Sequence, residues 1–288
     1  MKLLLTSVEQ GLIFAVLAMG VFLTYKILDI ADLSVEGTFP FGAFLFARFV
    51  SSGINPILST FLAFCLGSLA GLLTTTLFTR LKIKPILAGI LTMTILYSVN
   101  LKINGKSNIP LFSYGSIYDL GSTLLILIII VLIVKILLDL FLKTETGYLL
   151  IATGDNEVLV KSLGENSNKY KLIGLMLANG LVALSGALMA QHQGFVDITM
   201  GAGIIVVALA SIIIGDTIKK NSNILKNTTR AIIGAIIYKI IGGIAIDLGL
   251  NPNDLRAINA IIVIVFIAYN NTASNLFKLK GKGGAKNA

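Results

Sequence analysis

The sequence predicts an all-α polytopic membrane protein with about nine transmembrane helices, within a range of roughly eight to ten. Hydrophobic residues make up 56% of the 288 residues, and charged residues make up only 13%. The mean hydropathy is +0.91, far above that of a typical soluble globular domain. Several apolar runs also reach the roughly 20 residues that a helix needs to cross the hydrocarbon core of a bilayer.

The expected spans are the longest hydrophobic runs. They lie near residues 7–26, 38–51, 57–79, 85–101, 121–142, 171–190, 201–218, 230–248 and 257–270. No small-x-small cleavage site follows the first run, so we expect it to remain in the protein as a helix. The chain is therefore expected to contain one transmembrane domain, residues 1–274, followed by a basic tail, residues 275–288.

The basic residues predict which side of the membrane each loop occupies. The net charge of +9 would suggest a nucleic-acid partner in a soluble protein. In a membrane protein, basic residues gather in cytoplasmic loops beside anionic lipid, so lipid is the expected partner and nucleic acid is not. The basic clusters are Arg80, Lys82 and Lys84; Lys143, Lys161, Lys169 and Lys171; Lys219, Lys220, Lys226 and Arg230; and Lys278, Lys280, Lys282 and Lys286.

Alternation of the spans places these clusters on one side, which the positive-inside rule makes the cytoplasmic side of the plasma membrane. The C-terminus is then inside and the loop at residues 104–121 outside. The same alternation places the N-terminus outside. Residues 29–42 are rich in acids, glycine and proline, and a re-entrant segment there would change the side of the N-terminus.

Two short motifs suggest an inverted repeat. DLSVEG at residues 32–37 and DITMG at residues 197–201 share the order acid, aliphatic, hydroxyl, aliphatic, glycine, with one extra residue in the first copy. Each precedes an interrupted hydrophobic segment, and the predicted topology places them on opposite sides, as in transporters that bind their substrate at interrupted helices. The alternative is two unrelated helix caps. The candidate gate or pathway residues in these segments are Asp32, Ser34, Glu36, Gly37, Asp197, Thr199 and Gly201.

Two polar residues within the spans are further pathway candidates. Lys239 lies near the middle of its run, where an unpaired charge costs about 3 kcal/mol, and Asn179 lies within the run at 171–190. Such residues usually face the interior of the bundle or a cavity. The alternatives are a partner on another helix or snorkelling for Lys239, and a hydrogen bond to a neighbouring helix for Asn179.

The loop at residues 143–170 has the signals of a short amphipathic helix on the cytoplasmic side. This helix is expected to run from Gly154 to Gly164, with apolar residues in its middle. A helix of this length is marginal in water and needs a partner surface, which could be the inner ends of the same protein or another subunit. Asp155 or Asn156 can cap its start, and Glu157 lies in its first turn. Lys161 lies in its last turn, and Gly164 can end it.

These motifs resemble a known family. The stretches GYLLIATGDNEVLVKSLGENSNKYK and GLMLANGLVALSGALMAQHQG are similar to the coupling-helix loop and the following helix of ABC importer permeases of the branched-chain amino acid and ribose type. DLSVEGTFPFGAF resembles their Asp-Leu-Ser-Val-Gly motif, with Glu36 inserted before Gly37. Together with IKPILAGILTMTILYSVNLKING and NPNDLRAINAIIVIVFIA, the resemblance covers most of the chain and is greatest to the tryptophan or tyrosine permease group.

The resemblance implies a transport subunit and not an enzyme. It implies a permease pair, expected to be a homodimer, joined to a cytoplasmic ABC ATPase dimer and supplied by an extracytoplasmic solute-binding lipoprotein. The partner ATPase would use ATP and Mg, and this chain would bind no cofactor and no metal. The coupling helix maps onto the region Gly154 to Gly164, with Gly154, Asp155, Asn156, Glu157, Lys161 and Gly164 as the candidate ATPase-coupling residues. The expected solute is an amino acid, aromatic or branched-chain, with a sugar or nucleoside as the next candidate.

Two other functional classes remain as alternatives. An ion-coupled secondary transporter would need its own intramembrane ion site, but acidic residues are sparse within the spans. An integral-membrane enzyme would need a catalytic constellation. The sequence has one cysteine, Cys65, no HExxH motif, and no carboxylate pair close to a nucleophile.

Overall fold

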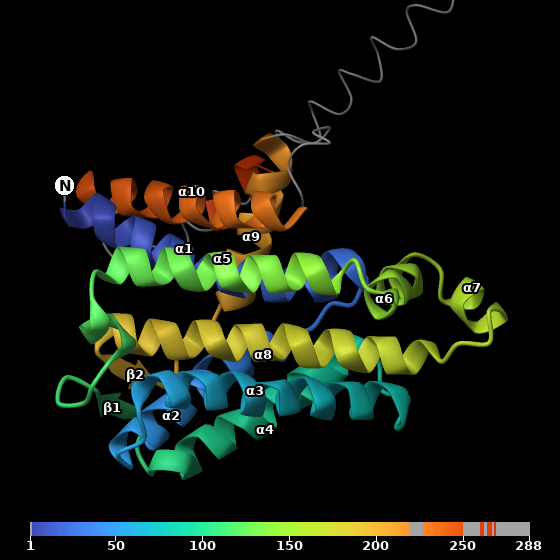
Figure 1. Ribbon diagram of the computed structural model, residues 1–288, viewed down its shortest axis with the longest axis horizontal. Helices are drawn as coiled ribbons and strands as arrows, with labels where there is room; N and C mark the ends of the chain where they lie inside the picture. The colour runs from blue at the N-terminus through green and yellow to red at the C-terminus, as the bar shows by residue number, and fades with distance from the viewer. Residues whose placement is uncertain (1, 219–226, 250–259, 262–263, 267, 269–288) are drawn as a thin grey trace, which may run out of the picture.

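The first eight of the predicted hydrophobic runs form helices in the computed structural model, which describes residues 2–218, 227–249, 260–261, 264–266 and 268 (Figure 1). The ninth run lies largely outside the described residues, and the 275–288 tail lies wholly outside them. In chain order the elements are α1 (Lys2–Phe22), the π-helix η1 (Leu23–Ile27), α2 (Val35–Ser51), α3 (Pro56–Thr79), α4 (Pro85–Asn104), β1 (Asn108–Pro110), the 3-10 helix η2 (Ile117–Leu120), α5 (Thr123–Phe141), α6 (Glu145–Asp155), α7 (Glu157–Ser162), α8 (Ser167–Gln193), β2 (Phe195–Asp197), α9 (Ile204–Ile218) and α10 (Asn227–Asp247).

Six segments within the described residues are long and apolar enough to cross a membrane. They are α1 with η1, α3, α4, α5, α8 and α10. Helix α9 is apolar but shorter, and α2 has only 17 residues. The prediction of an all-α, multi-pass membrane protein is confirmed, whereas the number of nine spans stays a prediction.

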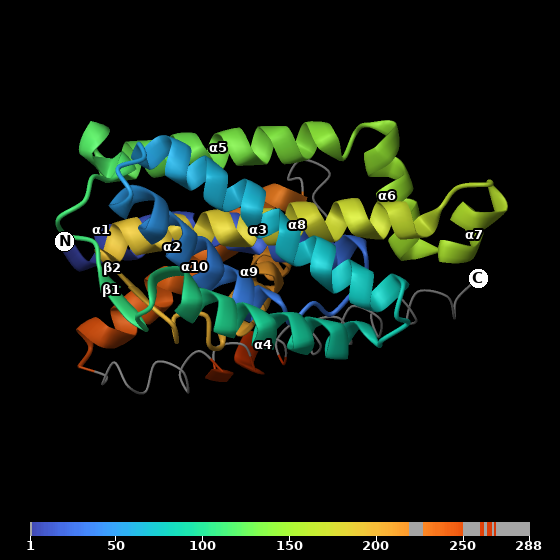
Figure 2. The ribbon, with the colours of Figure 1, turned by 90° about the horizontal axis from the view of Figure 1, so that it is seen from below.

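The two ends of the bundle differ in the elements that they carry (Figures 1 and 2). The strand end carries the antiparallel pair of β1 and β2, in which Ile109 pairs with Val196. The opposite end, called the α7 end below, carries α6, α7 and the basic loop between α3 and α4. The small sheet was not predicted, because three residues per strand are too few to produce a recognisable alternation.

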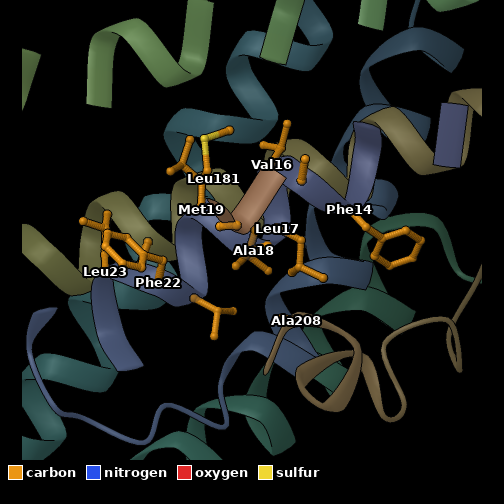
Figure 3. Packing of buried hydrophobic residues seen from close by; sticks show 14 of the residues in the cluster. Phe14, Val16, Leu17, Ala18, Met19, Phe22, Leu23, Leu181 and Ala208 are labelled. Carbon is orange, nitrogen blue, oxygen red and sulfur yellow. The ribbon is translucent and has the colours of Figure 1, made fainter. Parts of the chain in front are cut away.

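Helix α1 forms the centre of the core. The five consecutive residues from Ala15 to Met19 are 0% exposed. Figure 3 shows the side chains of α1 together with Leu181 of α8 and Ala208 of α9, which belong to the same buried cluster. Burial on every face, instead of along one stripe, is expected for a helix in the interior of a membrane bundle.

Glycines allow α8 to approach its neighbours closely. Gly42 of α2 packs on the backbone of Ala183, and Gly71 of α3 packs on the backbone of Leu175. A Cβ atom at either glycine would overlap with these backbone atoms. Small residues commonly provide such close helix contacts in membranes, where lipid gives no hydrophobic drive for helix association.

Two helices begin inside the bundle instead of at one of its ends. Helix α2 starts beside Asn179, at the middle of the 27-residue α8, and runs to the strand end, where Phe46 and Gly194 line a common cavity. Helix α9 starts next to the first turn of α2 and crosses the bundle (Figures 1 and 2), and Asp216 near its end pairs with Lys26 of η1. The two interrupted segments thus leave a shared junction in different directions, and the inverted repeat stays a prediction.

Candidate functional site

A buried polar cluster holds the start of α2 against α8. Asp32 is 2% exposed, and Ser34 and Asn179 are 0% exposed. Oδ1 of Asp32 accepts hydrogen bonds from the backbone N–H of Ser34 at 2.9 Å and from its hydroxyl at 2.5 Å, and Oδ2 accepts one from Nδ2 of Asn179 at 2.8 Å. Oδ1 of Asn179 accepts a further bond from the Thr38 hydroxyl at 2.7 Å. Since buried polar groups are costly unless paired, this cluster fixes the break before α2. It brings together three of the predicted pathway residues.

The second motif repeats the local geometry of the first. Oδ1 of Asp197 accepts hydrogen bonds from the backbone N–H of Thr199 at 2.8 Å and from its hydroxyl at 2.5 Å. Asp197 lies at the strand end, bonded to Asn108 of β1, and not in the middle of the bundle. Partial burial raises the pKa of Asp197, but the bonds from Thr199 and Asn108 outweigh this effect, so the pKa lies below its ordinary value. The shared turn fits both a repeat and two unrelated caps, so the repeat stays a prediction.

The two interrupted segments meet at the first turn of α2. Oε1 of Glu36 accepts a hydrogen bond from the backbone N–H of Gly203 at 3.1 Å. Gly201 packs directly on the carbonyl oxygen of Glu36 and on Cδ of Pro40. Pro40 has no N–H to donate to the carbonyl four residues earlier, which is that of Glu36, so this carbonyl is outside the helical ladder. A residue larger than glycine at position 201 would not fit this approach.

A cavity of about 350 Å³ lies beside this junction, a volume within the usual range of small-molecule sites. It combines predicted residues of both motifs with residues of α4. At Gly37, α2 packs closely on the backbone of Met93 in α4. The lining residues are Glu36, Gly37, Pro40, Met93, Thr94, Tyr97, Asn100, Ile198, Thr199 and Ala202. Tyr97 and Asn100 were missed in the sequence, although an amide in an apolar run was an available signal.

Lys239 lies elsewhere in the bundle. Its Nζ lies 3.9 Å from the centroid of the Phe14 ring in α1, a cation–π contact. The Phe14 ring is in turn stacked on Phe39 of α2 at 6.1 Å. Lys239 is therefore connected to α2 through aromatic packing, but it is not among the residues that line the cavity at Glu36.

The predicted coupling helix begins later than expected. Gly154 and Asp155 belong to the end of α6, so the prediction of one helix from Gly154 to Gly164 is wrong at its N-terminal side. The chain breaks at Asn156, which is extended and caps α7 by accepting a backbone hydrogen bond at 3.1 Å. Gly164, with φ of +83°, follows the end of α7 as expected. Gly154 instead packs on the carbonyl oxygen of Ile27 in η1.

Ion pairs within the same chain hold α7 in place. Glu157 pairs with Lys161 at 2.8 Å and with Lys171 of α8 at 2.7 Å, and it also accepts a hydrogen bond from Ser167 at 2.9 Å. The hydrogen bonds from Lys161 and then Lys171 lower the pKa of Glu157 to about 2. Two of the candidate coupling residues, Glu157 and Lys161, therefore have partners within the chain.

The surface that α7 leaves open is apolar. Val158, Leu159 and Leu163 are 75%, 50% and 64% exposed, while Val160 is fully buried and anchors the helix. Figure 1 shows α7 projecting beyond the rest of the bundle. Two of these side chains lie on the projecting six-residue helix and the third, Leu163, is its C-cap residue, and together they form a surface suited to a protein partner.

Comparison with known proteins assigns the family. The family model described as the permease component of branched-chain amino acid transport systems matches residues 3–268. The chain is 45% identical to a tyrosine transport system permease protein of Clostridioides difficile, over 97% of this chain and 95% of that protein. It is 23% identical to the ribose import permease protein of Escherichia coli K12, over 93% of this chain and 85% of that protein.

A solved structure shows the same fold. The structure of PsaBC from Streptococcus pneumoniae in complex with a Fab matches with a TM-score of 0.52 at 17% identity, covering 92% of this chain and 91% of that one. Identity this low supports the fold alone. The family match over nearly the whole chain supports more: the protein is a transport subunit and not an enzyme, and it belongs to the family of branched-chain amino acid transport system permease components.

Proposed function

We propose that this chain is the membrane-spanning permease of an ATP-driven ABC importer that moves an amino acid into the cell. The family description and the 45% identity to a tyrosine transport system permease support an amino acid as the solute. The identity to the ribose import permease is lower, 23%, and gives weaker support for a sugar. We place the α7 end and the C-terminus in the cytoplasm, because the basic loops lie at the α7 end. The strand end then faces an extracytoplasmic solute-binding protein.

The observation that carries the proposal is the exposed apolar surface of α7 on a helix that is fixed to the bundle. Val158, Leu159 and Leu163 are accessible to a partner, and Glu157 joins the helix to Lys171 near the start of α8. Seated in a groove of a cytoplasmic ATPase dimer, α7 would transmit closure of the nucleotide sites to the bundle as a rigid-body movement.

The movement has a continuous physical route into the middle of the bundle. Lys171 and Asn179 lie on the same uninterrupted helix, α8. Asn179 in turn bonds Asp32, which precedes the first turn of α2. A displacement of α7 therefore displaces the start of an interrupted helix, which is where alternating access is expected to change a pathway. In a dimer of two identical chains, the starts of both α2 helices would then border a single pathway.

The test is uptake by a reconstituted system. The full chain, the ATPase and the solute-binding protein encoded by neighbouring reading frames are placed in proteoliposomes, and uptake of L-tyrosine is measured with and without ATP. We expect uptake that requires ATP, all the partner proteins and an intact ATPase active site. A permease without the ATPase serves as the matched control and should take up nothing.

The rival is an ion-coupled secondary transporter. Uptake that persists without any ATPase and collapses when the ion gradient is dissipated would select this rival and overturn the proposal. Uptake that requires ATP but is specific for a sugar would keep the importer and overturn the solute class.

A further inference from the structure

The cavity at Glu36 contains a buried amide without a partner. Asn100 of α4 is 0% exposed, and both Nδ2 and Oδ1 lack a hydrogen-bond partner within the described part of the chain. An unpaired buried polar group has lost its hydrogen bonds to water without replacement, so folded proteins contain few such groups. Asn104, one turn later on the same helix, shows the ordinary case, because its Nδ2 donates to the carbonyl oxygen of Phe44 at 3.0 Å.

A carboxylate lines the same cavity. Glu36 is half-buried, and its Oε1 accepts the N–H of Gly203. Over the described residues, no hydrogen bond reaches its second oxygen, Oε2, and no ion pair neutralises the charge. The cavity is therefore lined by an anion with unused acceptor capacity and by an amide with unused donors and an unused acceptor.

The remaining lining residues define the chemistry of a matching solute. Thr94, Tyr97 and Thr199 add hydroxyl groups, and Pro40 and Met93 add apolar surface. Among the residues that the structure describes, the lining contains no lysine, arginine or histidine. An anionic group of a solute would find no cationic partner here, whereas a cationic nitrogen would find the Glu36 carboxylate. Thr94 and Tyr97 are exposed, so the cavity is accessible from outside the protomer.

We propose that the Glu36 carboxylate and the Asn100 amide form a solute subsite that binds the ammonium group of an amino acid in transit. Oε2 of Glu36 accepts N–H donors of the ammonium group, and Oδ1 of Asn100 accepts another. Nδ2 of Asn100 donates to an oxygen of the same solute. This subsite rests on the proposed import of an amino acid, and it names the groups of the permease itself that select for an ammonium-bearing solute.

A thiol-protection experiment tests the subsite directly. Thr94→Cys on a Cys65→Ser background places one thiol at the cavity, and the full chain in lipid nanodiscs is reacted with N-ethylmaleimide. The probes are L-tyrosine, tyramine, which lacks the carboxylate, and 3-(4-hydroxyphenyl)propionate, which lacks the ammonium group. We expect L-tyrosine and tyramine to slow the modification, and the propionate to have no effect at the same concentration.

The variant Glu36→Gln provides the decisive comparison, because glutamine keeps the volume and an oxygen that can accept the N–H of Gly203. We expect the concentration of L-tyrosine needed for half-protection to rise about tenfold or more, since the variant replaces a hydrogen bond to a charged acceptor by a weaker one to a neutral acceptor. Equal protection in Glu36→Gln, or equal protection by the propionate, would overturn the proposal.

Asn100→Leu separates a solute contact from a structural role. We expect this variant to be as stable as the parent or more stable, because it removes an unpaired buried amide, and to lose protection by L-tyrosine. The matched variant Asn104→Leu removes the bond to Phe44 and should lower the unfolding temperature without a selective loss of protection. If Asn100→Leu is the less stable of the two and keeps protection, Asn100 is a structural residue.

The outcome also distinguishes this inference from the importer itself. If the reconstituted system takes up L-tyrosine with ATP while no probe protects Thr94→Cys, the subsite is wrong and the importer stands. If the system takes up only sugars with ATP and no probe protects, the amino-acid assignment and the subsite both fail.

Discussion

The side-chain amide of Asn179 donates a hydrogen bond to Asp32 over 2.8 Å and thereby joins two segments that are 147 residues apart in the sequence. Asn179 lies at the middle of α8, and Asp32 precedes the interrupted helix α2. Because both side chains are fully buried, the bond fixes the position at which α2 begins inside the bundle.

Asn179→Leu should therefore abolish transport. The variant leaves Oδ2 of Asp32 and the Thr38 hydroxyl without the amide, and the unpaired groups should lower the free energy of unfolding by about 1–3 kcal/mol. Uptake per folded complex is measured in proteoliposomes, and stability is measured by thermal unfolding in detergent.

Gln191 provides a matched control on the same helix. Its buried amide accepts the N–H of Ile117 at 2.9 Å and donates to Thr60 at 3.0 Å, near the strand end and away from the start of α2. Gln191→Leu should lose a similar amount of stability but keep its uptake per folded complex. Equal loss of uptake in both variants would show that any buried defect in α8 stops transport, and would remove the special role of Asn179.

The exposed apolar residues of α7 should contribute to binding of the ATPase and not to the folding stability of the permease. Leu159→Glu should weaken binding of the ATPase by about 2 kcal/mol, or roughly thirtyfold in Kd, because it places a charge in an apolar contact. The unfolding temperature should not change, since Leu159 is 50% exposed. Lys169→Glu, a larger charge change at the same end of the bundle, serves as the control and should bind the ATPase more tightly than Leu159→Glu. Unchanged affinity of Leu159→Glu would place the ATPase contact elsewhere.

The ion pairs of Glu157 predict a pH dependence for the position of α7. Hydrogen bonds from Lys161 and Lys171 lower its pKa from 4.5 to about 2, so the folded state binds fewer protons than the unfolded state between these values. The stabilisation is fully present above about pH 4.5 and is lost as the pH falls toward about 2. Since 35% of the Glu157 side chain is exposed, screening should keep the effect under about 1 kcal/mol.

Hydrogen exchange of residues 157–162 measures this local stability. In the parent chain, protection should fall as the pH is lowered through this window, after correction for the intrinsic exchange rate. In Glu157→Gln, protection should be low at neutral pH and nearly independent of pH. A parent-like pH profile in Glu157→Gln would assign the titration to another group.

The junction of the two interrupted segments predicts a steric requirement at Gly201. Gly201→Ala would place a Cβ against the carbonyl oxygen of Glu36 and Cδ of Pro40, and overpacking of this kind costs about 1–3 kcal/mol. We expect lower stability and loss of uptake. Gly242→Ala is the control, because a Cβ there meets no atom of the described residues within 4 Å and alanine is the better helix former. It should be neutral or stabilising. Full uptake by Gly201→Ala would show that α9 and α2 need not touch.

Much of the fold follows from local patterns in the chain. The spans could be predicted because each is a continuous apolar run, and such a run has few stable conformations in lipid other than a helix. The end of α7 could be predicted because Gly164 is a left-handed stop, and its capping could be predicted because Asn156 is a common N-cap residue. The sequence left the cap open between Asp155 and Asn156, and it did not show that Gly154 and Asp155 end a separate, preceding helix.

The functional relationships depended on contacts between distant segments. The sequence alone identified a hydrophobic, basic chain with two Asp-x-Ser/Thr turns and a short helix in the loop at residues 143–170, because composition, hydrophobic runs and caps are local properties. Only the tertiary structure showed that Asp32 meets Asn179, that Glu36 shares a cavity with Asn100, and that Glu157 is committed to Lys171. Each of these pairs depends on how helices cross and how deep a residue lies in the bundle. Those quantities are set by packing over the whole chain and not by neighbouring residues.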